Sequence, residues 1–219
     1  MPLLATTFSV VCMDRRGRGT SGPLRPDHSL EVEYGDIGAV AALLAGPVHL
    51  LGHSSGARFA LHAAPRLADL ASLILYEPPA PEALTDPVIA SLARLEADGD
   101  REGILRLFFV DAVGVDEQDF AAMQGRPVWP LMVDNALTLP AELRAARGYR
   151  FDPAEVAELA VPTLLLLGEE TEEEVAGVTT RLAAALPAAE VAILPGQGHG
   201  AMFSAPGLLA SEIRRFLDR

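Results

Sequence analysis

The chain has 219 residues, half of them apolar, which is enough for one domain with a sizeable core and an inserted segment. Its net charge of −13, with arginine as all 17 basic residues, argues against nucleic acid or an anionic membrane as a partner. The sequence has a single cysteine, no basic leader with a cleavage site, and no apolar run of the roughly 18 residues that span a bilayer. We therefore expect a cytoplasmic protein without disulfides.

The first part of the chain begins with a predicted strand and a predicted helix, separated by a polar turn. A β-branched, apolar run over residues 7–13 predicts a buried parallel strand, which places Cys12 in the core. A turn rich in glycine and arginine follows over residues 14–23. Apolar residues at helical spacing then predict a helix over residues 30–45, which ends at Gly46.

Strands and helices alternate up to residue 79, and the alternation resumes after residue 160. Apolar runs predict strands over residues 47–51, 72–76, 161–168 and 190–194. Further helices are predicted after the first of these strands up to about residue 67, over 172–186 and over 205–217. This order predicts an α/β fold with a mostly parallel sheet flanked by helices.

Residues 80–160 break the alternation. They contain several helical patterns and no convincing strand, with predicted helices over residues 86–97, 101–113, 116–123, 128–136 and 141–147. Because apolar residues recur throughout, we interpret this segment as a helical insertion and not as a linker. The chain therefore divides into a core formed by residues 1–79 and 161–219 and an insertion formed by residues 80–160.

The pentapeptide Gly52-His53-Ser54-Ser55-Gly56 lies between a predicted strand and a predicted helix. Gly-x-Ser-x-Gly in this context is typical of a nucleophile elbow, a strained turn that lifts a serine hydroxyl clear of the sheet. We therefore predict Ser54 as a nucleophile, which needs a base to take its proton. His53 occupies the variable position, where it would line the pocket.

His199 lies in the glycine-rich loop after the last predicted strand. Gly196 and Gly198 suit a tight loop, and active sites in such sheets form at the carboxyl ends of the strands. We favour His199 as the base over its interpretation as a surface histidine.

Together these motifs resemble the α/β-hydrolase superfamily, and the resemblance covers nearly the whole chain. It rests on three segments in order: Asp14-Arg15-Arg16-Gly17-Arg18-Gly19-x-Ser21, the elbow, and Pro195-Gly196-Gln197-Gly198-His199. The resemblance implies an α/β-hydrolase fold in which residues 80–160 form a helical cap, with the nucleophile first and the histidine last in the chain. It also implies an architectural role for the loop that begins at Asp14.

A carboxylate that orients the imidazole of His199 is also implied. The family usually carries an aspartate about three residues after the glycine that closes its seventh strand, and that position is Thr171 here. Two candidates stand equal: Glu170, beside that position, and Glu77, directly after the strand at 72–76, where some family members carry the acid. Glu170 belongs to an acidic run that a helix N-terminus also favours.

The oxyanion hole is implied to use the backbone N–H of Ser55 and a second donor from a His-Gly loop upstream of Asp14. We expect the chain to lack that loop and the family's first three strands, one of which would lie between the strands at 7–13 and 47–51. Of three explanations, we favour a start upstream of Met1 over a fragment or degenerate copy, and over a homo-oligomer in which another protomer supplies the strand.

The function that the resemblance implies is that of a serine hydrolase without cofactor or metal, acting on a small molecule through a Ser54 acyl-enzyme. The expected substrate is a small or medium hydrophobic ester, thioester or lactone. Trp129, Phe109 and Met132 are candidate substrate contacts, although aromatic residues and methionines at helical spacing more often form a cap's own core. The alternatives are a non-catalytic or degenerate protein of the same fold without a complete oxyanion hole, and a carbon–carbon bond hydrolase.

Overall fold

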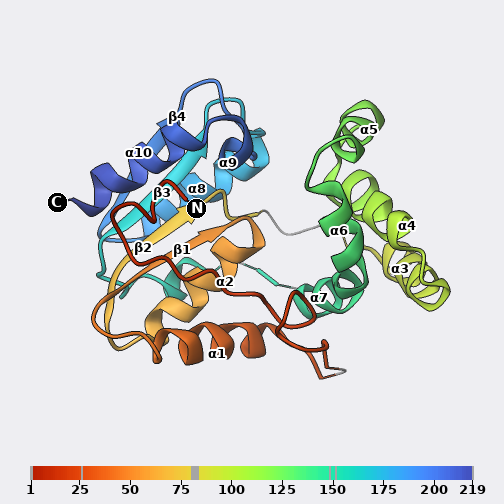
Figure 1. Ribbon diagram of the computed structural model, residues 1–219, viewed down its shortest axis with the longest axis horizontal. Helices are drawn as coiled ribbons and strands as arrows, with labels where there is room; N and C mark the ends of the chain where they lie inside the picture. The colour runs from red at the N-terminus through yellow and green to blue at the C-terminus, as the bar shows by residue number, and fades with distance from the viewer. Residues whose placement is uncertain (1, 26, 80–83, 148, 151, 219) are drawn as a thin grey trace. The chain divides into compact units, whose positions relative to one another are not determined.

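The computed structural model describes residues 2–25, 27–79, 84–147, 149–150 and 152–218 (Figure 1). The chain divides into two compact units. Unit 1 consists of Met1–Met13, Glu33–Ala80 and Phe151–Arg219, and unit 2 consists of Asp14–Val32 and Pro81–Arg150. Residues 14–32, placed in the core by the sequence, thus belong to the same unit as the helical insertion. That unit 2 acts as a cap stays a prediction.

Unit 1 is built on a four-stranded parallel sheet with the strand order β1-β2-β3-β4. The strands are β1 (Val48–His53), β2 (Leu70–Tyr76), β3 (Thr163–Gly168) and β4 (Ala189–Leu194). Their sequences are nearly continuous apolar runs, as expected for parallel strands covered on both faces. The predicted α/β class and the four strands from residue 47 onward are confirmed.

Alternation along the two central strands divides the core of unit 1 into two layers. Ile74 and Leu164 lie in one apolar cluster with residues of α10 (Pro206–Leu217). Leu75 and Leu165 lie in a second cluster, with residues of α2 (Ser55–Ala63) and α8 (Glu173–Ala185). Because successive side chains of a strand point to opposite faces, helices cover both faces. The candidate site residues described below follow the carboxyl ends of these strands.

Shorter elements complete unit 1. They are the 3-10 helices η1 (Ala64–Arg66) and η4 (Pro153–Glu155) and the one-turn helix α9 (Ala201–Ser204). Helix α1 (Leu30–Ala41) connects the two units in sequence and ends four residues earlier than predicted. The helix predicted over residues 205–217 is α10, and α9 precedes it as a separate turn. Helix α10 begins at a proline, a residue favoured in the first turn of a helix.

Unit 2 is helical wherever the structure assigns it regular secondary structure, in agreement with the sequence (Figure 1). Its elements are α3 (Asp86–Asp98), α4 (Arg101–Arg106), the π-helix η2 (Leu107–Val113), α5 (Glu117–Gln124), α6 (Trp129–Asn135), the 3-10 helix η3 (Ala136–Thr138) and α7 (Leu139–Ala146). Apolar faces of these helices form a separate cluster that includes Leu92, Ile104, Phe120 and Leu143.

The predicted buried strand over residues 7–13 is wrong. This segment has no regular strand, Val11 is 56% exposed, and Cys12 lies at the surface instead of in the core. A strand forms only where a neighbour accepts and donates its backbone hydrogen bonds. Within the described sheet, β1 pairs with β2 alone, and no strand pairs with residues 7–13.

The described residues include no helix that is both long enough and apolar enough to cross a membrane.

Candidate active site

The turn between β1 and α2 has the geometry of a nucleophile elbow. Ser54 has φ 55° and ψ −127°, a conformation that non-glycine residues rarely adopt. A Cβ at Gly52 would lie 2.3 Å from the carbonyl oxygen of Gly56, so only glycine fits there. The N–H of Ser54 donates to the Tyr76 carbonyl oxygen at 2.9 Å, which ties the elbow to β2.

Ser55 opens α2, directly after the predicted nucleophile. The first N–H groups of a helix have no partner within it, and the helix dipole favours negative charge at this end. Its backbone N–H is therefore suited to an oxyanion, and its role as a donor stays a prediction.

His199 and Glu77 form the central pair of the candidate site. The Nδ1 atom of His199 lies 2.6 Å from Oε2 of Glu77. The glutamate side chain is completely buried, whereas half of the histidine side chain is exposed. The other carboxylate oxygen, Oε1, accepts hydrogen bonds from the Gly168 N–H at 2.7 Å and from the Thr171 hydroxyl. Both oxygens of this buried carboxylate are thus bonded.

Backbone strain also marks Glu77. It has φ 46°, and among the described residues only Ser54 and Glu77 combine a positive φ with a side chain other than glycine. Such conformations cost about 1–3 kcal/mol each and cluster at functional sites, where the surrounding structure holds them. The two strained residues are the predicted nucleophile and one of the two candidate acids.

Opposing effects determine the charge of Glu77. Burial acts to raise the pKa of this carboxyl, but hydrogen bonds from His199, Thr171 and the Gly168 N–H outweigh burial, so the pKa is lowered. The carboxylate is therefore ionised at neutral pH. An acceptor of this kind keeps the proton of His199 on Nδ1 and leaves Nε2 free to accept a proton.

Tyr76 anchors the loop that carries His199. Its hydroxyl donates to the Gly198 carbonyl oxygen and accepts from the Ala201 N–H at 3.1 Å. The side chain is 1% exposed, and burial raises the pKa of the phenol to about 12. Tyr76 therefore stays neutral and keeps the proton that it donates. Close packing adds to this restraint, because a Cβ at Gly168 would lie 2.3 Å from the Gln197 carbonyl oxygen.

His53 supports the same loop from the elbow. Its Nε2 lies 3.0 Å from the His199 carbonyl oxygen, and the two imidazole rings are 4.5 Å apart between centroids. Burial, followed by the neighbouring His199, lowers the pKa of His53 to about 4. His53 is therefore neutral at pH 7, and its Nε2–H donates to the carbonyl. The sequence predicted a pocket position for His53 but not this bond.

We expect the free energy of unfolding to fall as the pH decreases from about 6.5 to about 4. Within this window the unfolded chain binds a proton at His53 that the folded chain does not, so acid favours unfolding, by up to about 3 kcal/mol at the lower end. Urea unfolding at several pH values measures this. A His53→Gln variant should have a shallower pH dependence in the window, and an unchanged slope would contradict the assignment.

The two candidate acids, Glu170 and Glu77, differ in whether their carboxylate contacts His199. Glu170 is exposed, and its backbone N–H donates to the Gln197 carbonyl oxygen at 2.8 Å. Of the two, Glu77 is the one whose carboxylate the structure joins to His199.

The three residues predicted as candidate substrate contacts lie in the apolar cluster of unit 2. Trp129 is 8% exposed and meets Phe120 edge-on, with 5.6 Å between ring centroids. Phe109 and Met132 are partly buried against the same cluster. Their packing matches the core interpretation weighed from the sequence, and a contact with substrate stays a prediction.

The model of the Alpha/beta hydrolase family matches residues 1–212. The chain belongs to this family. It is 26% identical to 2-(acetamidomethylene)succinate hydrolase of Mesorhizobium japonicum over 98% of this chain and 80% of that protein. A shorter match, to N-formylmaleamate deformylase of Pseudomonas putida, is 46% identical over 33% of this chain and 28% of that protein.

A solved structure gives the same family. An alpha/beta hydrolase from Sphaerobacter thermophilus is 31% identical to this chain and superimposes with a TM-score of 0.85, over 99% of this chain and 86% of that one. The agreement extends over both units of the sequence.

Sequence reasoning missed the residues that support this candidate site. Tyr76 was interpreted only as the end of a strand, and Gly168 only as the glycine that closes the next one. For Thr171 a signal was available, because it occupies the position where the family usually carries its acid. The Thr171 hydroxyl donates a hydrogen bond to Glu77, which follows the neighbouring strand β2.

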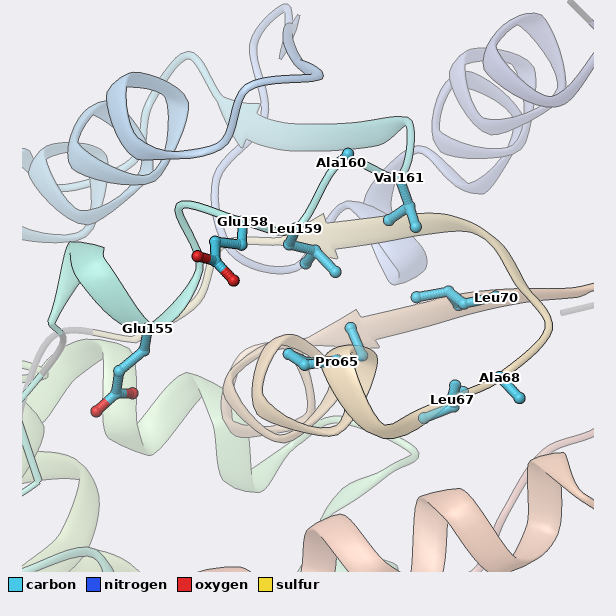
Figure 2. A pocket seen from close by; sticks show the side chains of 10 residues that line it. Pro65, Leu67, Ala68, Leu70, Glu155, Glu158, Leu159, Ala160 and Val161 are labelled. Carbon is cyan, nitrogen blue, oxygen red and sulfur yellow. The ribbon is translucent and has the colours of Figure 1, made fainter.

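Unit 1 also contains a hollow of about 580 Å³, and Figure 2 shows the side chains that line it. Residues from 64–70 and 155–161 line it, mostly apolar ones, with Glu155 and Glu158. Leu70 begins β2 and Val161 precedes β3, so the hollow lies at the amino ends of these strands. Ser54, Glu77 and His199 follow carboxyl ends, and we assign this hollow no part in their chemistry.

Proposed function

We propose that the protein is a serine hydrolase with Ser54 as nucleophile, His199 as general base and Glu77 as the acid that orients the base. The observation that carries this proposal is the bond between His199 Nδ1 and the buried Glu77 carboxylate. The strained elbow supports it, because His53, whose ring is 4.5 Å from that of His199, directly precedes Ser54.

The arrangement supports a two-step acyl transfer. His199 Nε2 takes the hydroxyl proton as Ser54 Oγ attacks the acyl carbon, and Glu77 stabilises the imidazolium that forms. The oxyanion accepts a hydrogen bond from the Ser55 N–H. The imidazolium then protonates the leaving group, and His199 next activates the water that releases the acid from Ser54.

An ester, thioester or lactone with a small or medium hydrophobic group is the first substrate class that we propose. A second class, small N-acylated acids, is favoured by the names of the two relatives, an acetamidomethylene succinate hydrolase and an N-formylmaleamate deformylase. Carbon–carbon bond hydrolysis uses the same three residues. A panel of p-nitrophenyl esters, a thioester, lactones, the relatives' two named compounds and a vinylogous 1,5-diketone separates the classes by kcat/KM.

Covalent labelling tests the nucleophile before any substrate is known. We expect wild-type protein incubated with a fluorophosphonate to gain the mass of one adduct, because the probe reacts with activated serines. The Ser54→Ala variant should gain none. Ser55→Ala is the matched control, since its backbone N–H is kept, and it should label like the wild type.

A folded wild-type protein that forms no adduct would overturn this proposal. That result would favour the non-catalytic alternative, in which the oxyanion hole is incomplete. Circular dichroism of each variant establishes that the protein is folded when labelling is measured.

A further inference from the structure

Thr171 is bonded to the candidate acid although it carries no charge itself. Its hydroxyl donates to Oε1 of Glu77, the oxygen that also accepts the Gly168 N–H. The two residues come from different strands, since Glu77 follows β2 and Thr171 lies three residues beyond Gly168, the last residue of β3. The turn that carries Thr171 is closed by a hydrogen bond from its own N–H to the Gly168 carbonyl oxygen at 3.2 Å.

We propose that Thr171 is a positioning residue, whose hydroxyl fixes the Glu77 carboxylate so that the second oxygen faces His199 Nδ1. A single donor at Oε1 would leave the carboxylate plane free to rotate about that bond. Two donors from one turn hold the oxygen in place, and Oε2 is left for the histidine. Hydrogen bonds to an ionised and completely buried carboxylate are among the stronger ones in proteins.

The inference rests on the proposed function for its kinetic consequence. If Glu77 orients the base, a less restrained carboxylate reduces the fraction of molecules in which His199 is correctly placed. The substrate does not bind to Thr171 in this scheme, so kcat should change and KM should not.

The pair Thr171→Val and Thr171→Ser tests the hydroxyl at nearly constant shape. We expect valine to lower kcat about tenfold with KM unchanged, and serine to retain most of kcat because it keeps the donor. The acid limb of kcat against pH should move to higher pH in the valine variant, because losing a donor to the carboxylate raises the pKa of Glu77. Wild-type kcat and pH profile in an active Thr171→Val enzyme would overturn the inference.

A double-mutant cycle separates positioning from a merely structural role. If Thr171 acts through Glu77, adding Thr171→Val to Glu77→Gln should change kcat less than about twofold. A further tenfold loss in the double variant would mean that Thr171 acts independently of Glu77, which contradicts the proposal.

Unfolding measurements keep this test distinct from that of the proposed function. Thr171→Val should lower the urea midpoint at pH 7, where Glu77 is ionised, and the two proteins should converge as the pH falls through the pKa of Glu77. This readout needs no catalysis. If wild type and Thr171→Val had equal urea midpoints at pH 7, the proposal that the Thr171 hydroxyl holds the Glu77 carboxylate would be contradicted. A shifted midpoint in a protein without hydrolase activity would overturn only the proposed function.

Discussion

Replacing His199 by alanine is expected to lower kcat/KM by about 10⁴- to 10⁶-fold, since the serine then lacks its base. The structure gives this histidine a buried, ionised partner at 2.6 Å, and no other described imidazole is bonded to Glu77. The fold should survive, because half of the side chain is exposed. Steady-state kinetics on the best substrate of the panel, with circular dichroism alongside, measure the effect.

The matched control for this prediction is His49→Ala. His49 is exposed near the beginning of β1, five residues before Ser54, and its Nδ1 lies 2.8 Å from the hydroxyl of Ser72. We expect it to keep kcat/KM within about threefold. If His199→Ala retained more than about one tenth of the wild-type activity, a different base would have to be found.

Replacing Glu77 by glutamine should lower kcat by about 10⁴-fold with little change in KM. Two donors, the Gly168 N–H and the Thr171 hydroxyl, hold the oxygen of the new amide at the position of Oε1. The amide nitrogen then faces His199 Nδ1 and donates to it. The imidazole must carry its proton on Nε2, where it cannot accept the proton of Ser54.

Glu170→Gln is the control that decides between the two acids suggested by the sequence. Because Glu170 is exposed and it is its backbone N–H that bonds to the Gln197 carbonyl oxygen, we expect kcat and labelling rate close to wild type. The reverse outcome, a large loss in Glu170→Gln and a small one in Glu77→Gln, would contradict the assignment of the acid. Equal, small losses in both would mean that His199 needs no carboxylate partner.

Local patterns in the sequence were sufficient for the elbow and for most of the secondary structure. Glycines around Ser54, an apolar run before it and a helical pattern after it all act over a few residues. The same holds for the helical segments of unit 2, whose apolar spacing shows in short windows. Where the pattern was local, its prediction agrees with the structure, although the segment predicted as one helix over residues 101–113 is divided between α4 and the π-helix Leu107–Val113.

Other features depend on partners that are distant in the chain. The apolar run at residues 7–13 had the composition of a buried strand, but a strand exists only where a neighbouring strand pairs with it, and in the described sheet none does. Composition specifies how well a segment would fit a sheet and not which edge is available to it.

The sequence by itself determined the α/β class, the serine elbow and the histidine loop, because each is encoded in consecutive residues. Only the tertiary structure decided which carboxylate contacts the histidine, since Glu77 and His199 are 122 positions apart and follow β2 and β4, which both pair with β3. It also showed that Thr171 is hydrogen-bonded to Glu77, and that Tyr76 and His53 are hydrogen-bonded to the loop that carries His199. Hydrogen bonds between distant segments form only when the sheet brings its carboxyl ends together, so no short window of the sequence contains them.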